Sequence, residues 1–136
     1  MINVVEILKF MGELGVLYEP KTLPMAFDYV SDMLHDHRIV EIRKDGTPHA
    51  IIFFSVCNDY EPYLKKGEFE YLPDNPSGKI IYVEVMIARR WTRELREKFE
   101  ELLATKYPNF EYGVWHRMAS WGDRKVIAKR RLQHVL

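Results

Sequence analysis

The feature that most constrains the fold is a run at residues 79–104, KIIYVEVMIARRWTRELREKFEELLA. Its first part, IIYVEVMIA, is almost continuously apolar, which is typical of a central strand buried on both faces. Its second part carries apolar residues at helical spacing behind Thr92, a candidate N-cap. A strand that passes directly into a helix predicts a right-handed crossover. The next strand, FEYGVWHRM, is therefore expected to lie parallel to the first.

Two helices are predicted before this run. The first is expected to open at Asn3, whose side chain can cap it, and to end at Gly15. The second is expected to bury a stripe made by Phe27, Val30 and Leu34.

Further strands complete the predicted sheet. The dipeptide Asp45-Gly46 lies between two apolar runs, which is the strongest short-range signal for a β-hairpin. A third strand, GEFEYL, is expected at residues 67–72, and RKVIAKRRL is expected to form the last one. The predicted order is α-α-β-β-β-β-α-β-β. This is an α/β (α+β) fold in which a mixed, mostly antiparallel sheet carries helices on both faces, in a single domain at residues 1–136.

Composition narrows the classes of partner and compartment. The chain has 20 Lys and Arg residues and 20 Asp and Glu residues, and this balance argues against nucleic acid as a partner. A single cysteine, Cys57, rules out an internal disulfide and indicates a reducing compartment. No apolar run approaches the length of a membrane span. We therefore expect a cytoplasmic protein.

Charge is uneven only near the C-terminus, where five basic residues follow residue 123 without an acidic one. One interpretation is an edge strand that its charges protect against pairing with another sheet. The other is a surface for a phosphate-bearing partner. The pair of histidines in His35-Asp36-His37 lacks further ligands at suitable spacing, so no metal site is predicted.

The order of elements, the Asp45-Gly46 hairpin and the helix directly after a buried strand resemble the GNAT family of N-acetyltransferases. In that family, backbone amides between the fourth strand and the following helix hold the pyrophosphate of acyl-CoA. A splay between the fourth and fifth strands admits the pantetheine. The resemblance therefore implies acetyl-CoA or another acyl thioester as cofactor.

Two divergent groups are similar in pattern. EIRKDGTPHAIIFFSV and residues 79–117 resemble the first hairpin and the strand–helix–strand core of the RTX-toxin-activating lysine acyltransferases, which use acyl-carrier protein. Those enzymes carry a catalytic carboxylate at the place of Glu84. Small GNAT-like proteins of phages, some of them virion components without known catalysis, are the other group. This second resemblance implies a virion-associated protein if the chain is encoded by a phage.

The junction after the strand is the candidate cofactor site. A helix N-terminus presents unpaired N–H groups and partial positive charge, so a phosphate can bind there without glycines. The other interpretation is that the arginines face solvent and pair with acidic residues of the helix. The candidate cofactor-binding residues at the end of the strand and in the junction are Met86, Ala88, Arg89, Arg90, Thr92 and Arg93.

Three residues are candidates for catalysis. Glu84 lies within the most apolar strand, and a buried carboxylate is a candidate general base for deprotonating an amine. His116 and Tyr112 lie on the neighbouring strand, from which His116 could share the acid–base work. The structural interpretation of Glu84 is a carboxylate paired with an arginine or a tyrosine.

Two functions follow from these observations. The first is an acyltransferase that moves an acyl group from a CoA or acyl-carrier thioester to an amine, on a small molecule or a protein. The second is a non-catalytic GNAT-like binding or structural module. In that case the tryptophans and arginines would contact a protein partner.

Overall fold

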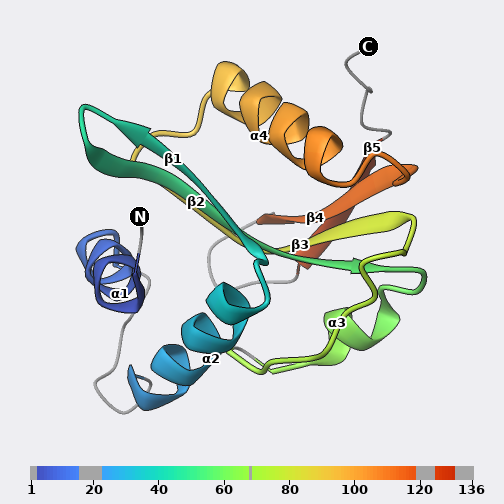
Figure 1. The fold of residues 1–136 in the computed structure, drawn as a ribbon, viewed down its shortest axis with the longest axis horizontal. Helices are drawn as coiled ribbons and strands as arrows, with labels where there is room; N and C mark the ends of the chain where they lie inside the picture. The colour runs from blue at the N-terminus through green and yellow to red at the C-terminus, as the bar shows by residue number, and fades with distance from the viewer. Residues whose placement is uncertain (1–2, 16–22, 68, 119–124, 131–136) are drawn as a thin grey trace.

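The chain folds into a five-stranded sheet with helices on both faces (Figure 1). The computed structural model describes residues 3–15, 23–67, 69–118 and 125–130, and from residue 115 onward it describes the backbone alone. The elements, in chain order, are α1 (Val4–Glu13), α2 (Leu23–His35), β1 (Ile39–Lys44), β2 (Thr47–Cys57), α3 (Glu61–Lys65), β3 (Ile80–Ala88), α4 (Arg93–Lys106), β4 (Tyr112–Met118) and β5 (Lys125–Arg130).

The strands lie in the order β1-β2-β3-β4-β5, so sequence neighbours are also neighbours in the sheet. The pair β3–β4 is parallel, and the three other pairs are antiparallel. This confirms the expected mixed α+β class and the parallel pair around the crossover helix. The hairpin is confirmed as well, because Asp45 and Gly46 both adopt positive φ between β1 and β2.

The order of elements differs from the expectation in one segment. The described residues of 67–72 form no strand, and the short helix α3 precedes them, so the observed order is α-α-β-β-α-β-α-β-β. Phe69 has a φ of 57°, which interrupts an extended conformation. Its ring packs 5.8 Å from that of Tyr29, so the apolar side chains of this segment bury themselves against α2 and need no partner strand.

Two apolar cores lie on opposite faces of the sheet. On one face, Leu95, Phe99 and Leu103 of α4 pack on side chains of β1, β2 and β3. On the other face, α1 and α2 pack on Phe53 and Ile87 (Figure 1). The helices on both faces are therefore confirmed.

The buried stripe of α2 differs from the predicted one. Val30 is buried as predicted and Leu34 is partly buried against the same core, but Phe27 is 46% exposed. The other residues that face the sheet are Ala26, Tyr29 and Met33. The physical reason is that α2 is rotated to aim Tyr29 and Met33 at the core, which turns Phe27 outward.

A β-bulge in β3 positions the candidate site. Phe53 pairs with Val85 and Phe54 pairs with Val83, so Glu84 is an extra residue without a partner on β2. A bulge bends a strand and increases its twist. On the other side of β3, pairing with β4 ends at Tyr82, two residues before the bulge. The second half of β3 therefore diverges from β4.

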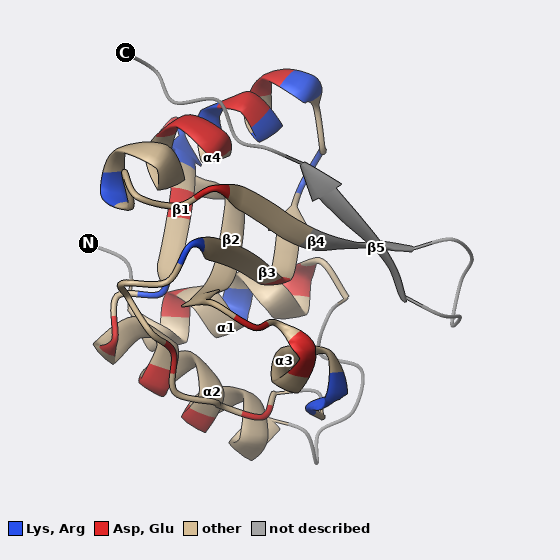
Figure 2. Cartoon of the chain, turned by 90° about the vertical axis from the view of Figure 1, so that its right-hand side faces the viewer, with Lys and Arg blue, Asp and Glu red and all other residues tan. Residues whose placement is uncertain are grey.

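Charge is distributed differently on α4 and on α2. Figure 2 shows acidic and basic residues interspersed along α4, whereas the charged residues of α2 are acidic only. The basic strand β5 is an edge strand, as one of the two interpretations of the sequence requires. Within the described ranges, every helix is too short or too polar to cross a bilayer.

Candidate functional site

Glu84 is the centre of a buried polar network. Its side chain is 2% exposed. The oxygen Oε1 accepts a hydrogen bond of 3.0 Å from the Tyr29 hydroxyl and lies 2.8 Å from Nζ of Lys66. The oxygen Oε2 lies 3.1 Å from Nη2 of Arg38 and accepts a short hydrogen bond from the Ser55 hydroxyl. Each carboxylate oxygen therefore has two partners, which is its full complement.

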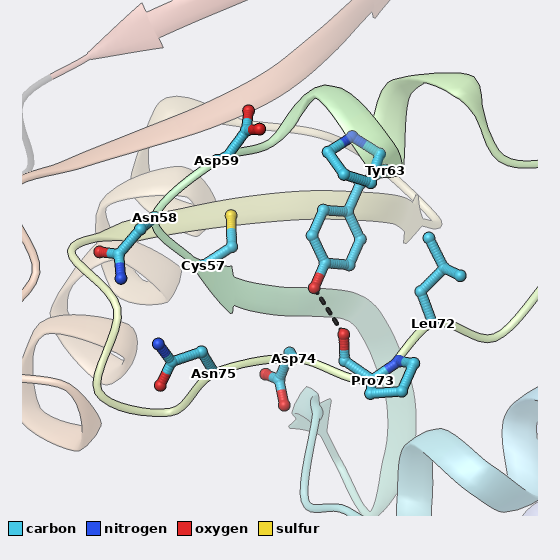
Figure 3. A pocket seen from close by; sticks show the side chains of 9 residues that line it. Cys57, Asn58, Asp59, Tyr63, Leu72, Pro73, Asp74 and Asn75 are labelled. Carbon is cyan, nitrogen blue, oxygen red and sulfur yellow. Dashed lines mark hydrogen bonds between the residues drawn. The ribbon is translucent and has the colours of Figure 1, made fainter.

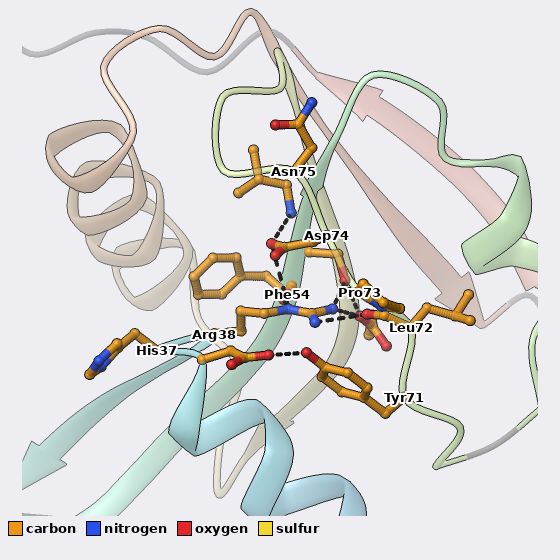
Figure 4. A network of polar contacts seen from close by, with 12 residues as sticks. His37, Arg38, Phe54, Tyr71, Leu72, Pro73, Asp74 and Asn75 are labelled. Carbon is orange, nitrogen blue, oxygen red and sulfur yellow. Dashed lines mark hydrogen bonds and ion pairs between the residues drawn. The ribbon is translucent and has the colours of Figure 1, made fainter.

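Arg38 links this carboxylate to a second one. It is 1% exposed, and its guanidinium reaches groups on three segments of the chain (Figure 4). Nε donates to the Phe54 carbonyl and lies 3.6 Å from Oδ2 of Asp74, and Nη1 donates to the Leu72 carbonyl at 2.8 Å. The network thus contains two cations, Arg38 and Lys66, and two carboxylates, Glu84 and Asp74, so its charges balance.

This arrangement bears directly on the candidate general base. A base must direct a lone pair at the proton that it removes. Both oxygens of Glu84 are occupied by protein groups, so the carboxylate can act as a base only after one of these contacts opens. The geometry favours the structural interpretation, in which Glu84 fixes the bulge of β3 to α2 and to the segment after α3.

Tyr29 is held as a neutral hydrogen-bond donor in the same network. Burial is the main cause that raises the pKa of its hydroxyl, and the neighbouring carboxylate of Glu84 raises it further. Its ring also lies 5.1 Å below Nζ of Lys66, a cation–π contact. Tyr29 is therefore a structural partner of Glu84 with no tendency to give up its proton.

The backbone of β3 beyond Tyr82 is the open part of this region. Glu84 as a whole residue is partly exposed although its side chain is buried, so its exposed surface belongs mainly to the main chain. Further along, Met86 is 37% exposed. After the strand, Trp91 is 43% exposed and stacks on Phe99 of α4 with the ring centroids 6.0 Å apart. This region therefore combines a strand edge that is not paired with β4 and two exposed apolar side chains.

The three arginines of the junction point to different places. Arg89 lies toward α1, where Nη2 is 2.9 Å from Oε2 of Glu13 and the guanidinium covers the ring of Phe10. Arg93 pairs with Glu97 one turn along α4. Arg90 is exposed and forms no ion pair or hydrogen bond within the described part of the chain. It is thus the cation that remains for a ligand.

The N-terminus of α4 is capped as predicted. Thr92 Oγ1 accepts a hydrogen bond of 3.1 Å from the backbone N–H of Leu95, and the Thr92 carbonyl accepts one from Arg96. The N–H groups of Arg93 and Glu94 have no partner among the described residues. They are the two amides that a bound anion could accept from. Ala88 packs its side chain against the core on the α4 face and offers a ligand only its backbone.

No protein-family model matches the chain, and no curated protein matches it. Function therefore rests on the residues themselves.

The two other catalytic candidates are not brought to Glu84 by any described contact. Tyr112 pairs with Ile80, which lies four residues before Glu84. Four residues of a strand span about 13 Å, so Tyr112 is at least that far from Glu84 along the sheet. His116 pairs with Ile127 of β5, beyond the point where β4 leaves β3, and its side chain lies outside the described part. The predicted pairing of Glu84 with His116 stays a prediction.

Metal and thiol chemistry find no support at this site. Among the side chains that the structure describes, those of residues 3–15, 23–67 and 69–114, no three of His, Cys, Asp or Glu come together as a metal centre would need. Cys57 is buried, and this burial raises the pKa of its thiol to about 12. Its thiol is therefore protonated and unreactive at neutral pH.

Arg38 and Lys66, the two cations of the network, were not predicted from the sequence. Both are charged residues in connecting segments, and neither has a local pattern that marks it as buried. The available signal was indirect: a carboxylate within an apolar strand requires a partner. That argument predicts that a partner exists, but it cannot choose one among 20 basic residues.

Replacing Thr92 by alanine should destabilise the protein by about 1 kcal/mol, because the N–H of Leu95 loses its acceptor. Urea unfolding followed by circular dichroism measures this loss. The matched control is Thr105→Ala at the other end of α4, where the hydroxyl only bonds the carbonyl of Glu101. That variant should be neutral or slightly more stable, since alanine is the better helix former. Equal losses in the two variants would contradict a capping role.

Proposed function

We propose that this chain is a divergent acyltransferase of the GNAT type, which moves an acyl group from a CoA or acyl-carrier thioester to an amine. The observation that carries the proposal is the divergence of β3 from β4 after Tyr82, next to a helix N-terminus. A parallel strand pair that opens in this way leaves an unpaired strand edge. Such an edge can accept another extended chain through backbone hydrogen bonds.

A pantetheine arm has the chemistry that this edge requires. Its two amide groups can bond to the main chain of β3 beyond Tyr82, in the manner of an added strand. Its phosphate end would then reach Arg90 and the unpaired amides of Arg93 and Glu94. Met86 and Trp91 offer apolar contact for the rest of the donor.

The reaction would join the nitrogen of the acceptor amine to the carbonyl carbon of the thioester. The C–N bond forms and the C–S bond breaks, and the proton lost by the nitrogen goes to the departing thiolate. A backbone N–H of β3 can stabilise the negative charge on the carbonyl oxygen during this step. Glu84 is a positioning residue in this scheme, because its partners hold the bend that exposes the main chain.

A second candidate function is a non-catalytic binding module on the same scaffold. Glu84 favours it, because a carboxylate with two partners on each oxygen is not available for proton transfer. The arginines favour it too, because Arg89 and Arg93 are already paired with acidic residues. Exposed Trp91 and Arg90 would then contact a protein partner.

Thermal melting with CoA, acetyl-CoA and phosphopantetheine separates the two functions. A ligand at ten times its Kd should raise the Tm of a chain of this size by about 4 °C, through mass action. Arg90→Glu should remove most of this shift, because it places a negative charge at the phosphate position. A shift with CoA but not with phosphopantetheine would show that the nucleotide part of the donor is recognised. A shift with CoA and with phosphopantetheine would show that the pantetheine arm, which they share, is recognised.

The control variant is Lys9→Glu, which makes the same charge change at an exposed position of α1. It should retain the full shift. If neither CoA nor phosphopantetheine raises the Tm, the donor site is refuted and the binding module is the better description. If both variants lose the shift equally, the effect is one of overall charge and the assignment of Arg90 is wrong.

A further inference from the structure

A pocket of about 390 Å³ lies at the other end of β3 from the open strand edge (Figure 3). It is formed by the end of β2, the start of α3 and the segment that precedes β3. Its lining consists of Cys57, Asn58, Asp59, Pro62, Tyr63, Leu72, Pro73, Asp74 and Asn75. This volume falls within the range of small-molecule sites.

One side of the pocket is apolar and rigid. Tyr63 is buried, and its hydroxyl donates a hydrogen bond of 2.6 Å to the Pro73 carbonyl, as Figure 3 shows. Burial raises the pKa of this hydroxyl to about 12, so the ring carries no charge. Leu72 and Pro62 extend the apolar lining. An apolar group of a ligand, of the size of one aromatic ring, can pack against these side chains.

The charge of the pocket has one sign. Its lining includes two aspartates and no lysine or arginine. Asp74 is already committed, because its Oδ2 accepts from the backbone N–H of Val56 and faces Arg38. Asp59 accepts from the N–H of Glu61 through Oδ1, and it has no ion pair within the described ranges. Its charge is therefore left for a ligand.

We propose that this pocket binds a small organic cation, a protonated primary amine carried by a short aromatic or aliphatic body. The ammonium group pairs with Asp59 at the rim, and the body packs on Tyr63 and Leu72. Since no three metal-ligating side chains meet among the described residues, an organic cation fits better than a metal ion. The proposal is independent of acyl transfer, because the pocket and the open edge lie at opposite ends of β3.

The test uses 2-phenylethylamine against its neutral analogue 2-phenylethanol, which has nearly the same shape. We expect the amine to bind in the millimolar range and to shift the backbone amide resonances of residues around Asp59 and Tyr63 in a ¹H–¹⁵N spectrum. The alcohol should bind about fivefold more weakly, which corresponds to the upper value for an exposed ion pair. Equal affinities for the two compounds would overturn the proposal, and so would no binding of the amine.

The matched variants are Asp59→Asn and Asp28→Asn. Asparagine at position 59 keeps the oxygen that accepts from Glu61, so α3 should remain intact while the charge is lost. Asp28 is an exposed acid of α2, and its variant makes the same change in net charge. Asp59→Asn should lower the affinity for the amine about fivefold and leave that for the alcohol unchanged, and Asp28→Asn should alter neither. Equal losses in the two variants would show that the attraction comes from overall charge.

Discussion

Arg38→Met should destabilise the protein by about 3–5 kcal/mol, because it removes one partner of a buried ion pair and leaves the other uncompensated. Glu84 and Asp74 would both lose a cation. The carbonyls of Phe54 and Leu72 would lose a donor, although methionine preserves much of the aliphatic stem. Since a domain of this kind is stable by about 5–15 kcal/mol in total, the variant should lie near the limit of folding. Urea unfolding measures the loss.

Arg43→Met is the matched control. Arg43 lies on β1 and pairs with Glu6 and Glu41, but its side chain is 30% exposed. An exposed ion pair contributes little to stability, so this variant should unfold at nearly the same urea concentration as the native protein. A similar loss in the two variants would mean that burial of Arg38 is not what makes it important.

The double variant Arg38→Met with Glu84→Gln tests whether the two groups act as one network. Each single change leaves a buried charge without its partner, whereas the double change removes both charges. Its loss should therefore be smaller than the sum of the single losses, by about 0.5–3 kcal/mol. If Arg38→Met does not fold, Arg38→Gln and its double variant provide the same comparison, because glutamine also removes the charge. Additive losses would show that the contact between Arg38 and Glu84 carries no energy.

The same network explains which parts of the structure could be predicted from sequence. Asn3, Thr92 and the Asp45-Gly46 turn were assigned correctly, because capping and turn formation depend on residues a few positions apart. Glu84 could be recognised as unusual from the sequence, because a carboxylate in an apolar strand needs a partner in any fold, whereas its predicted catalytic role stays a prediction. Its partners could not be named, because Tyr29, Arg38 and Ser55 approach it only after the sheet has formed.

The segment between β2 and β3 shows why local patterns can fail. GEFEYL alternates apolar and polar residues, which is typical of a strand. However, Phe69 and Tyr71 turn to α2 and to Arg38, so a helix face and a guanidinium bury them in place of a neighbouring strand. The preceding helix, α3, has only five residues, too few for a helical period to be visible. Both pieces contribute to the lining of the pocket, through Pro62 and Tyr63 of α3 and through Leu72, so the pocket could not be predicted from the sequence.

Gly78→Ala should destabilise the protein by about 3 kcal/mol, at the upper end of the range for inserting a methyl group into a packed site. A Cβ at Gly78 would lie 2.5 Å from the carbonyl oxygen of Cys57 and 2.6 Å from its carbonyl carbon. These are backbone atoms of β2, so no side chain can move aside. The turn before β3, which is fixed to β2 by a bond from the N–H of Asn75 to the Val56 carbonyl, would have to shift.

Gly12→Ala is the control for this prediction, because it adds the same methyl group where nothing lies within 4 Å. Gly12 belongs to α1, and alanine in a helix is favoured over glycine by up to about 1 kcal/mol. The two substitutions should therefore change the urea midpoint in opposite directions. Gly78 also fixes the turn that holds Asp74 and Asn75 at the pocket. If Gly78→Ala folds with native stability, the backbone does not approach Cys57 as closely as the structure has it, and the shape of the pocket has to be revised.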